Sequence, residues 1–385
     1  MCGFVGYIVE EKNELYGNSL LQGMKKRIEH RGPDDDGSYF WNEENECAVL
    51  SQNLNDTKEL PYLKNENLTF SPHLALGHQR LSIQDLSHFG HQPLSDDQGN
   101  YWIVYNGEIF NYMELKVDLE KLGYTFYSNT DTEVLLKGYK EYGIEILNKI
   151  DGFYSFVLFD KEKQKVIATR DNTGVKPLYY TCHNGVFAFA SEIKAFFELP
   201  RFNAEPEDEV IQNFLIHEKI EIDKKTFYKN VYQLMPGELL TYDLKAFSYS
   251  IDPFVFTVNT SGIELKQQII DSVKSRLLSD VPIGFALSGG IDSTLISSIA
   301  NTKLAGKINL FSANSNNPVY DESKWQEMAN HKIQGNWFKT YVDTDLIDFE
   351  KLNYIQDGPI MAANNIANYQ LYKTVKSKGI KVLLN

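Results

Sequence analysis

The sequence predicts an α+β domain followed by an α/β domain that is built on a parallel sheet. With 385 residues, the chain is long for one domain and comfortable for two. From about residue 37 to 190, short aromatic and β-branched runs alternate with polar connections, which favours antiparallel hairpins over βαβ units. Beyond residue 280, an apolar run, a glycine turn and a helical pattern follow one another, as in a parallel sheet.

The composition indicates a folded globular protein, because 42% of the residues are hydrophobic and 23% are charged. A net charge of −14 without a basic cluster argues against a nucleic-acid partner. Three cysteines, Cys2, Cys47 and Cys182, suit a reducing compartment, so we expect a cytoplasmic protein in which Cys47 and Cys182 are buried. No stretch approaches the ~18 apolar residues of a membrane span, and no signal peptide or membrane partner is expected.

The first domain is expected to begin with a strand over residues 2–9 and an amphipathic helix over 19–27. Later segments with strand or helix patterns follow in order. Strands are expected at 74–76, 81–83, 101–105, 153–160, 165–170, 178–181, 186–190 and 239–242, and helices at 113–122 and 132–147. We place this domain at residues 2–205 and a connecting segment at 206–255, with 252–261 as the best linker.

The second domain is expected over residues 256–385, where strand and helix patterns alternate. The expected strands are 281–287, 308–313, 339–343 and 381–384, and the expected helices are 263–278, 295–301, one that opens at 320–323, and 368–378. This order is typical of an α/β unit.

Cys2 directly follows the initiator Met1, which methionine aminopeptidase removes when a small side chain comes next. Removal would leave one residue with both a thiol and a free α-amine. Because an α-amine titrates near ~8 and a thiol near ~8.5, the amine can take the thiol proton at neutral pH. On this observation alone, Cys2 is either a nucleophile or a chance buried cysteine.

Five further stretches, at 30–35, 77–83, 105–111, 129–133 and 170–179, supply groups that hydrolysis of a small amide would need. They read His-Arg-Gly-Pro-Asp-Asp, Gly-His-Gln-Arg-Leu-Ser-Ile, Tyr-Asn-Gly-Glu-Ile-Phe-Asn, Asn-Thr-Asp-Thr-Glu and Arg-Asp-Asn-Thr-Gly-Val-Lys-Pro-Leu-Tyr. In this order, and with Cys2, they resemble the class II glutamine amidotransferases, which are N-terminal-nucleophile (Ntn) hydrolases. The resemblance covers residues 2 to about 200 and implies a four-layer αββα sandwich.

A glutamine pocket needs a cation, an anion and donors for a tetrahedral oxyanion. By the resemblance, Arg80 would bind the substrate carboxylate and Asp131 its ammonium, while Glu108 would frame the amino-acid end. The implied catalytic residues are Cys2, Asn106 and Gly107, with the Asn106 amide and the Gly107 N–H as the oxyanion hole. The implied glutamine-binding residues are Arg80, Leu81, Ser82, Ile83, Asn106, Gly107, Glu108 and Asp131.

Each of these residues, taken singly, also has a structural interpretation. Arg80 could form a surface ion pair, and Asp131 could cap a helix that begins at Thr132. Asn106 and Gly107 could form a hairpin turn. The order of the motifs behind Cys2 favours the glutamine pocket.

The second half carries a strand, a glycine turn and a helix around Ser-Gly-Gly-Ile-Asp-Ser at 288–293. Glycines let a backbone approach a phosphate, and a helix N-terminus favours its charge. The stretch lacks the Walker lysine and the Rossmann glycine spacing. It resembles the pyrophosphate loop of ATP-pyrophosphatases, which implies ATP and Mg²⁺ as cofactors. The ATP-binding residues implied are Leu287, Ser288, Gly289, Gly290, Asp292, Ser293 and Ala313, with Asp292 also the metal ligand.

Together the two halves resemble glutamine-hydrolysing asparagine synthetases, with an incomplete second domain. The implied activity is glutamine-dependent, ATP-consuming amidation of a carboxylate through an acyl-adenylate, and the implied partners are L-glutamine, ATP and L-aspartate. Residues 361–367 depart from the Arg-containing stretch of aspartate users, which leaves a sugar carboxylate as the alternative acceptor. The family continues beyond residue 385 into a Gly-x-Gly-Ala-Asp-Glu segment, so a truncated chain with glutaminase activity only is a further alternative. Assembly of the chain into a homodimer is a further open alternative.

Overall fold

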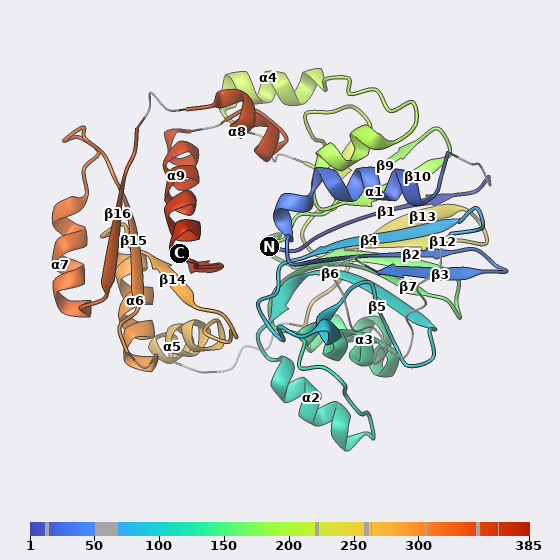
Figure 1. Cartoon of the computed structure of the whole chain (residues 1–385), viewed down its shortest axis with the longest axis horizontal. Helices are drawn as coiled ribbons and strands as arrows, with labels where there is room; N and C mark the ends of the chain where they lie inside the picture. Colours follow the sequence, from blue (N-terminus) through green and yellow to red (C-terminus); the bar gives the residue numbers. More distant parts are fainter. Residues whose placement is uncertain are drawn as a thin grey trace. The chain divides into compact units, whose positions relative to one another are not determined.

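The computed structural model describes residues 1–11, 15–50, 68–219, 223–257, 262, 264–304, 306–343, 347–360 and 362–385. The chain divides into two compact units, Met1–Val258 and Asn259–Asn385 (Figure 1). Within the described ranges, no helix combines the length and the apolar character that crossing a membrane requires.

The first unit contains two antiparallel sheets. One has the strand order β11-β9-β10-β1-β4-β2-β3 and the other β13-β12-β8-β7-β6-β5. The strands of the first are β1 (Gly3–Val9), β2 (Asp35–Trp41), β3 (Glu46–Leu50), β4 (Leu74–Arg80), β9 (Tyr179–His183), β10 (Val186–Ala190) and β11 (Val231–Gln233). Those of the second are β5 (Leu94–Ser95), β6 (Tyr101–Ile109), β7 (Gly152–Asp160), β8 (Lys165–Arg170), β12 (Glu238–Asp243) and β13 (Ser248–Pro253).

Alternating side chains on each sheet give this unit four layers. Along β1, Phe4 belongs to the core between the two sheets, whereas Val5 packs in a separate core with α1 (Asn18–Arg27) and the 3₁₀ helix η4 (Ile193–Glu198). On the far side of the second sheet, a third core joins β6 and β7 to α2 (Tyr112–Lys121) and α3 (Asp131–Tyr142). The layer order is helix, sheet, sheet, helix, and Figure 1 shows α1 and α3 on opposite sides of the strands. The predicted αββα sandwich is confirmed.

Several predicted elements of this unit differ from the structure. Residues 81–83 are not a strand, because the Leu81 N–H donates to Cys2 Sγ and the Ser82 N–H to Asp34 rather than to a neighbouring strand. The helix expected over 132–147 ends at Tyr142, where Gly143 takes a φ of +60° and a 3₁₀ helix, η3 (Gly143–Asn148), follows. Cys47 is buried as predicted, but Cys182 is exposed.

The segment at 206–255, which the sequence sets apart as a connection, adds structure to the first unit. It contains α4 (Asp208–His217), β11, β12 and β13, and β12 pairs with β8 while β13 pairs with β12. The proposed linker at 252–261 therefore begins inside β13, and residues 258–261 lie outside the described part. Two more 3₁₀ helices, η1 (Glu29–Arg31) and η2 (His88–Gly90), lie in loops.

The second unit is built on a parallel sheet with the order β16-β15-β14-β17, as the α/β prediction requires. Its strands are β14 (Ile283–Ala286), β15 (Asn309–Asn314), β16 (Asn336–Tyr341) and β17 (Val382–Leu384). Its helices are α5 (Leu265–Ser275), α6 (Ile291–Lys303), α7 (Ser323–Ile333), α8 (Phe349–Gln356) and α9 (Ala363–Ser377). Phe285 and Leu310 lie in the core on one face, and Phe311 packs with α9 on the other.

The ends of several helices and strands in this unit differ from the predicted ends by a few residues. The helix expected at 295–301 begins at Ile291, so part of the glycine-turn motif forms its first turn. The strand expected at 339–343 begins at Asn336, and the helix expected at 368–378 begins at Ala363. Ile263, the expected start of the first helix, and Met361 lie outside the described residues.

Candidate active site

The Cys2 thiol lies where β1 begins, beside the end of β4. Gly3 pairs with Gln79, and this register brings the Leu81 N–H within 3.3 Å of Cys2 Sγ, to which it donates. Burial raises the pKa of the Cys2 thiol, while the N-terminal amine, the Leu81 hydrogen bond and the Arg80 charge act in the opposite direction. The thiolate therefore has a backbone donor in place but needs a base to form at neutral pH.

A chain-terminal amine lies next to this thiol. The pKa of the Met1 α-amine is lowered from 8.0 to about 6, mainly by burial and also by the Arg31 and Lys176 charges, while the Cys2 and Glu108 charges act in the opposite direction. An amine with such a pKa is mostly neutral at pH 7 and can accept a proton. The surroundings of the chain start thus favour an amine that acts as a base.

Arg31 and Glu192 hold the backbone of Cys2. The Arg31 Nε donates to the Cys2 carbonyl oxygen at 2.8 Å, and its Nη1 donates to Glu192 Oε1 at 2.8 Å. Lys194 and His30 contact the same carboxylate. Burial alone would raise the pKa of Glu192, but the His30 hydrogen bond and the charges of Arg31 and Lys194 lower it to about 2. Glu192 is thus the anion that balances the cations beside the chain start.

Asn106 and Gly107 lie in the middle of β6, not in a hairpin turn. Asn106 pairs with Ser155 and Gly107 with Tyr154 across to β7. The Asn106 side chain is 1% exposed, yet no residue in the described ranges accepts a hydrogen bond from its Nδ2. Because buried amides normally have partners, this N–H group is available to a ligand.

The Gly107 N–H points to the same edge of β6 as two N–H groups that bind side chains. Tyr105 N donates to Gln92 Oε1 at 2.7 Å, and Ile109 N donates to Asp131 Oδ2 at 2.9 Å. Successive strand residues direct their N–H groups to opposite sides, so the Gly107 N–H lies between these two and away from β7. This orientation suits an oxyanion donor.

Arg80 is buried, with 5% of its surface exposed, so it is not a surface ion pair. Its Nη1 donates to the Ser87 carbonyl at 2.8 Å, and its Nη2 donates to the Gln84 and Asp85 carbonyls. Neutral carbonyls leave the guanidinium with its full positive charge. Arg80 therefore remains a cation suited to an incoming carboxylate.

Asp131 is the first residue of α3, and Thr130, whose hydroxyl accepts from Glu133 N, is the N-cap. Asp131 Oδ2 accepts from the Tyr105 hydroxyl at 2.8 Å and from Ile109 N. Burial raises the pKa of Asp131, although these hydrogen bonds oppose the shift. The Asp131 carboxyl group is thus held in place by neutral donors, and the capping interpretation is wrong because Thr130 is the N-cap.

Glu108 interacts electrostatically with both the Cys2 thiol and the Asp131 carboxyl group. Burial and the Asp131 charge raise its pKa to about 8, while Lys176, the N-terminal amine and a 2.7 Å hydrogen bond from Gln84 Nε2 oppose the shift. The carboxyl group is therefore mostly protonated at pH 7. A cation placed beside it would favour its ionised form.

The structure brings the glutamine-binding residues predicted from sequence to one place, where β1, β4 and β6 meet. His78 of β4 links to the Tyr105 carbonyl of β6 at 3.0 Å. Leu81, Ser82 and Ile83 form the irregular segment that follows β4. Gln84, Tyr105, Lys176 and Glu192 have roles in this arrangement that no sequence pattern indicates. Lys176 belongs to a loop that Asp171 organises by accepting from Thr173 N, Val175 N and Lys176 N.

A cavity of about 300 Å³ lies elsewhere, on the α1 side of the first sheet. Its lining comprises Gln22, Lys25, Lys26, Glu29, Gly32, Pro33, Asp35, Asp36 and Gln79. None of these is a predicted glutamine-binding residue, so the cavity does not locate the site. The hydrogen-bonding geometry around Cys2 does.

The glycine turn of the second unit folds around two serines. Ser288 Oγ and Ser293 Oγ are 3.0 Å apart, and Gly290 N donates to Ser288 Oγ at 3.2 Å. Gly290 is the N-cap of α6, and Gly289 has a φ of +85°. Exposed N–H and hydroxyl groups at the start of a helix form a cradle for phosphate.

Leu287 and Ala313 lie at the carboxyl ends of the neighbouring strands β14 and β15, where parallel sheets bind ligands. Leu287 N donates to the Phe311 carbonyl at 2.8 Å. In the described parts of the chain, no three His, Cys, Asp or Glu side chains gather as a metal site. One carboxylate, Asp292 in the first turn of α6, fits Mg²⁺ that is held by one or two carboxylates and nucleotide phosphates.

Two family models match the sequence. Residues 64–254 match a glutamine amidotransferase domain, and residues 264–385 match asparagine synthase. Glutamine-hydrolysing asparagine synthetase 1 of Bacillus subtilis is 35% identical over 311 residues, which are 78% of this chain and 44% of that protein. A putative glutamine-hydrolysing asparagine synthetase 2 of Methanocaldococcus jannaschii is 30% identical over 419 aligned residues, covering 100% and 73% of the two chains. The amidase chry2 of Gibberella zeae is 29% identical over 424 residues, covering 100% and 58%.

The αββα sandwich and the matched residues define the first unit as a glutamine amidotransferase domain of the Ntn type, followed by part of an asparagine synthase domain. The chain belongs to the family of glutamine-hydrolysing asparagine synthetases. It spans between 44% and 73% of the length of the three relatives above.

Proposed function

We propose that the chain hydrolyses L-glutamine at Cys2 and uses the ammonia to amidate a carboxylate. The observation that carries this proposal is the Cys2 thiol, whose Sγ accepts from Leu81 N at 3.3 Å, together with the buried Asn106 amide of β6, which has no acceptor within the described ranges. A nucleophile on β1 and an oxyanion donor on β6, two strands that contact each other across the two sheets, support acyl transfer.

In the proposed reaction, loss of Met1 gives Cys2 its own α-amine, which takes the thiol proton. The thiolate sulfur attacks the side-chain amide carbon of glutamine, and the developing oxyanion accepts from Asn106 Nδ2 and the Gly107 N–H. The protonated amine gives its proton to the leaving nitrogen, so that ammonia departs and a thioester remains. Water then cleaves the thioester, which yields glutamate and regenerates the thiol.

Opposite charges would select the substrate. Arg80, bound to neutral carbonyls, would take the glutamine carboxylate, and Asp131 with Glu108 would take its ammonium. Because Glu108 has a pKa of about 8, binding of the ammonium would shift it to the carboxylate form. Removing Arg80 would leave a buried substrate carboxylate without a partner, a loss of ~2–4 kcal/mol.

In the second unit, we propose that the turn at 288–293 holds the pyrophosphate of ATP while an acceptor carboxylate is adenylated. Ammonia then displaces AMP from the acyl-adenylate and leaves an amide. Mg²⁺ held by Asp292 would neutralise phosphate charge. Relatives named as asparagine synthetases support L-aspartate as acceptor, while relatives named as amidases keep another carboxylate, such as that of a sugar, as the second candidate.

The glutaminase half is tested by glutamate release and labelling. After intact mass has shown that Met1 is absent, the chain should release glutamate from L-glutamine, and Cys2→Ala should abolish the release. A diazoketone analogue of glutamine should add one label, at Cys2. Cys182→Ala removes an exposed thiol and should change nothing. Glutamate release by the Cys2→Ala chain would sink the assignment.

The acceptor is tested by exchange of labelled pyrophosphate into ATP, which occurs only when a carboxylate is adenylated. Exchange that depends on L-aspartate would support the asparagine synthetase reaction. Exchange that depends on a uronic acid, but not on L-aspartate, would support the second candidate.

A further inference from the structure

The short segment 84–87 contacts Arg80 and Glu108, two of the three charged residues proposed to bind the amino-acid end of glutamine. It also contacts the loop that precedes the third, Asp131. Its carbonyls bind the Arg80 guanidinium, and the Gln84 amide donates to Glu108 Oε2 at 2.7 Å. The remaining contact comes from Asp85, whose carboxylate reaches the loop that leads into Asp131. One turn therefore bears on both ends of a bound amino acid.

Asp85 joins these two ends through different atoms. Its carbonyl accepts from Arg80 Nη2, while its Oδ2 accepts from Asn129 N at 2.8 Å. Its Oδ1 accepts from Ser87 N and from the Ser87 hydroxyl, which closes the turn on itself. The backbone at Asp85 has a φ of +49°, an uncommon conformation that these contacts hold. A shift of Asp85 would therefore move both the carbonyl on Arg80 and the carboxylate on Asn129.

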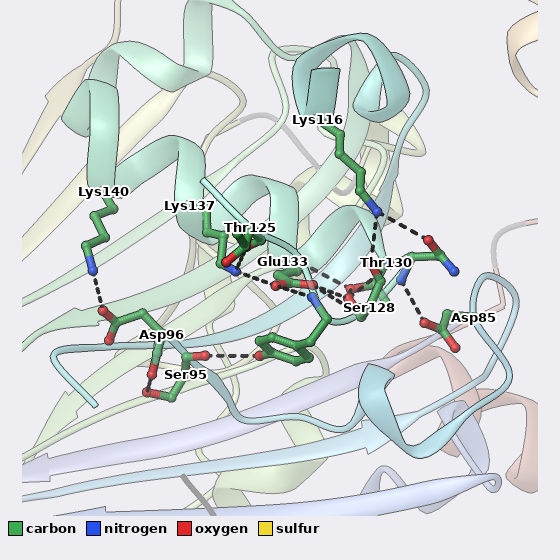
Figure 2. A network of polar contacts seen from close by, with 12 residues as sticks. Asp85, Ser95, Asp96, Lys116, Thr125, Ser128, Thr130, Glu133, Lys137 and Lys140 are labelled. Atoms are coloured by element: carbon green, nitrogen blue, oxygen red, sulfur yellow. Dashed lines mark hydrogen bonds and ion pairs between the residues drawn. The ribbon is translucent and has the colours of Figure 1, made fainter. Parts of the chain in front are cut away.

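The loop on the other side is itself anchored, as Figure 2 shows. The Ser128 N–H donates to Glu133 Oε2 at 2.8 Å, and Thr130 Oγ1 accepts from Glu133 N at 3.2 Å. Glu133 is fully buried and pairs with Lys137, while Lys116 donates to the Ser128 carbonyl and to Asn129 Oδ1. Asp131 follows this loop directly, so a displacement of Asn129 would also displace the start of α3.

Charge supports a role for the ionised carboxylate of Asp85. Burial alone would raise its pKa, but the hydrogen bonds from Asn129 and Ser87 lower it below its usual value. A carboxylate accepts from three donors here, whereas an asparagine has one acceptor oxygen and an NH₂ group that cannot accept. Asp85→Asn must therefore give up part of this set, either at Ser87 or at Asn129.

We propose that Asp85 is a positioning residue that sets the spacing between Arg80, which binds the substrate carboxylate, and Asp131, which binds the ammonium. The inference rests on the proposed glutaminase. Asp85 would touch neither glutamine nor the reacting atoms, so its effect is on substrate selection. A substrate that carries both a carboxylate and an ammonium depends on this spacing, whereas one without an ammonium depends on it much less.

The test compares L-glutamine with 4-carbamoylbutanoate, which has the same amide and carboxylate but no ammonium. For Asp85→Asn we expect KM for L-glutamine to rise about tenfold with kcat nearly unchanged, as for the loss of one charge-assisted hydrogen bond. The preference for L-glutamine over 4-carbamoylbutanoate, as a ratio of kcat/KM values, should fall about fivefold or more. Iodoacetamide does not bind through Arg80 or Asp131, so the rate at which it alkylates Cys2 should be the same in Asp85→Asn as in the wild type.

Asp118→Asn is the matched control, since Asp118 forms an exposed ion pair with Lys121 on α2, and it should leave the preference as it is. A merely structural role would lower activity on both substrates equally, and an unchanged preference in a folded Asp85→Asn chain would overturn the inference. Should that variant not fold, Asp85→Glu keeps the charge but displaces it and must shift the preference in the same direction. Wild-type protein that releases no glutamate would instead overturn the proposed function and, with it, this inference.

Discussion

The Arg31 guanidinium donates from Nε to the backbone carbonyl oxygen of Cys2 at 2.8 Å. The same guanidinium donates from Nη1 to Glu192, which is 161 residues further along the chain and is also held by Lys194. Because the carbonyl belongs to the residue that carries the thiol, this contact fixes the start of β1 from outside the strand. The orientation of Cys2 thus depends on a buried ion cluster.

The first prediction is that Glu192→Gln destabilises the first unit by ~3–5 kcal/mol, because it leaves the buried cations of Arg31 and Lys194 without their anion. Urea unfolding followed by far-UV circular dichroism measures this change. Glu198→Gln is the control, since the Glu198–Arg27 pair is roughly one-third exposed on each side and should contribute ~1 kcal/mol or less. Equal losses in the two variants would contradict the role given to the cluster.

The same cluster gives a pH dependence with a definite sign. The pKa of Glu192 is about 2 in the folded chain against an ordinary 4.5, so its contribution is complete above about pH 4.5 and is lost as the pH falls towards 2. The wild-type chain should lose stability in this window more steeply than Glu192→Gln. Parallel curves for the two proteins would show that Glu192 is not stabilised as an anion.

Much of the fold follows from local sequence patterns, and the errors have local physical causes. The Leu-Ser-Ile stretch at 81–83 has the alternation of a strand, but the N–H groups of Leu81 and Ser82 bind Cys2 and Asp34. The helical pattern continues past Gly143, where a positive φ ends α3. In both places a hydrogen bond or a backbone angle overrides side-chain periodicity.

The residues of the candidate site likewise fall into those that sequence motifs indicate and those that only the folded structure reveals. Arg80, Asn106 and Asp131 lie in recognisable motifs, so the sequence alone puts them forward as candidates. Glu192 and Asp85 act through partners that are 161 and 44 residues away, and no periodicity reveals such pairings. Their contributions therefore required the folded chain.

The second prediction concerns protons released on binding. Glu108 has a pKa of about 8 and is mostly protonated at pH 7, and a glutamine ammonium beside it would favour the carboxylate. Binding of L-glutamine to the Cys2→Ala chain should therefore release up to about one proton. Isothermal titration in buffers of different ionisation enthalpy measures the number. Glu108→Gln should abolish the release, and an unchanged release in that variant would exclude Glu108 as its source.

The third prediction is that Gly107→Ala lowers kcat for glutamate release about 100-fold, the typical loss for one oxyanion donor. A Cβ at this position would lie 2.6 Å from the Phe153 carbonyl oxygen and 2.7 Å from the Tyr105 hydroxyl, so β6 must shift and carry the N–H with it. Gly17→Ala is the control, because its nearest neighbour would be an ordinary 3.7 Å away. Steady-state kinetics measures the change in kcat, and a normal kcat would remove Gly107 from the oxyanion hole.

The last prediction compares alanine substitutions at two glycines of the second unit that have the same backbone angle. Gly289 and Gly306 both have a φ of +85°, so an alanine at either position carries similar backbone strain, of order 1 kcal/mol. At Gly306 a Cβ would meet nothing within 4 Å, whereas at Gly289 it would lie 2.7 Å from Trp325 Cβ and 2.8 Å from Gln326 N. Only Gly289→Ala should therefore push α7 away from the phosphate turn.

We expect Gly289→Ala to lower the thermal stability of the second unit more than Gly306→Ala does, and to reduce any stabilisation by Mg-ATP. Differential scanning calorimetry with and without nucleotide measures both effects. Glutamate release should be the same in both variants as in the wild type, because the residues of the proposed glutamine site all precede residue 200. Equal stability losses would mean that the turn accommodates a side chain, and the close approach of α7 would then not explain why a glycine stands at position 289.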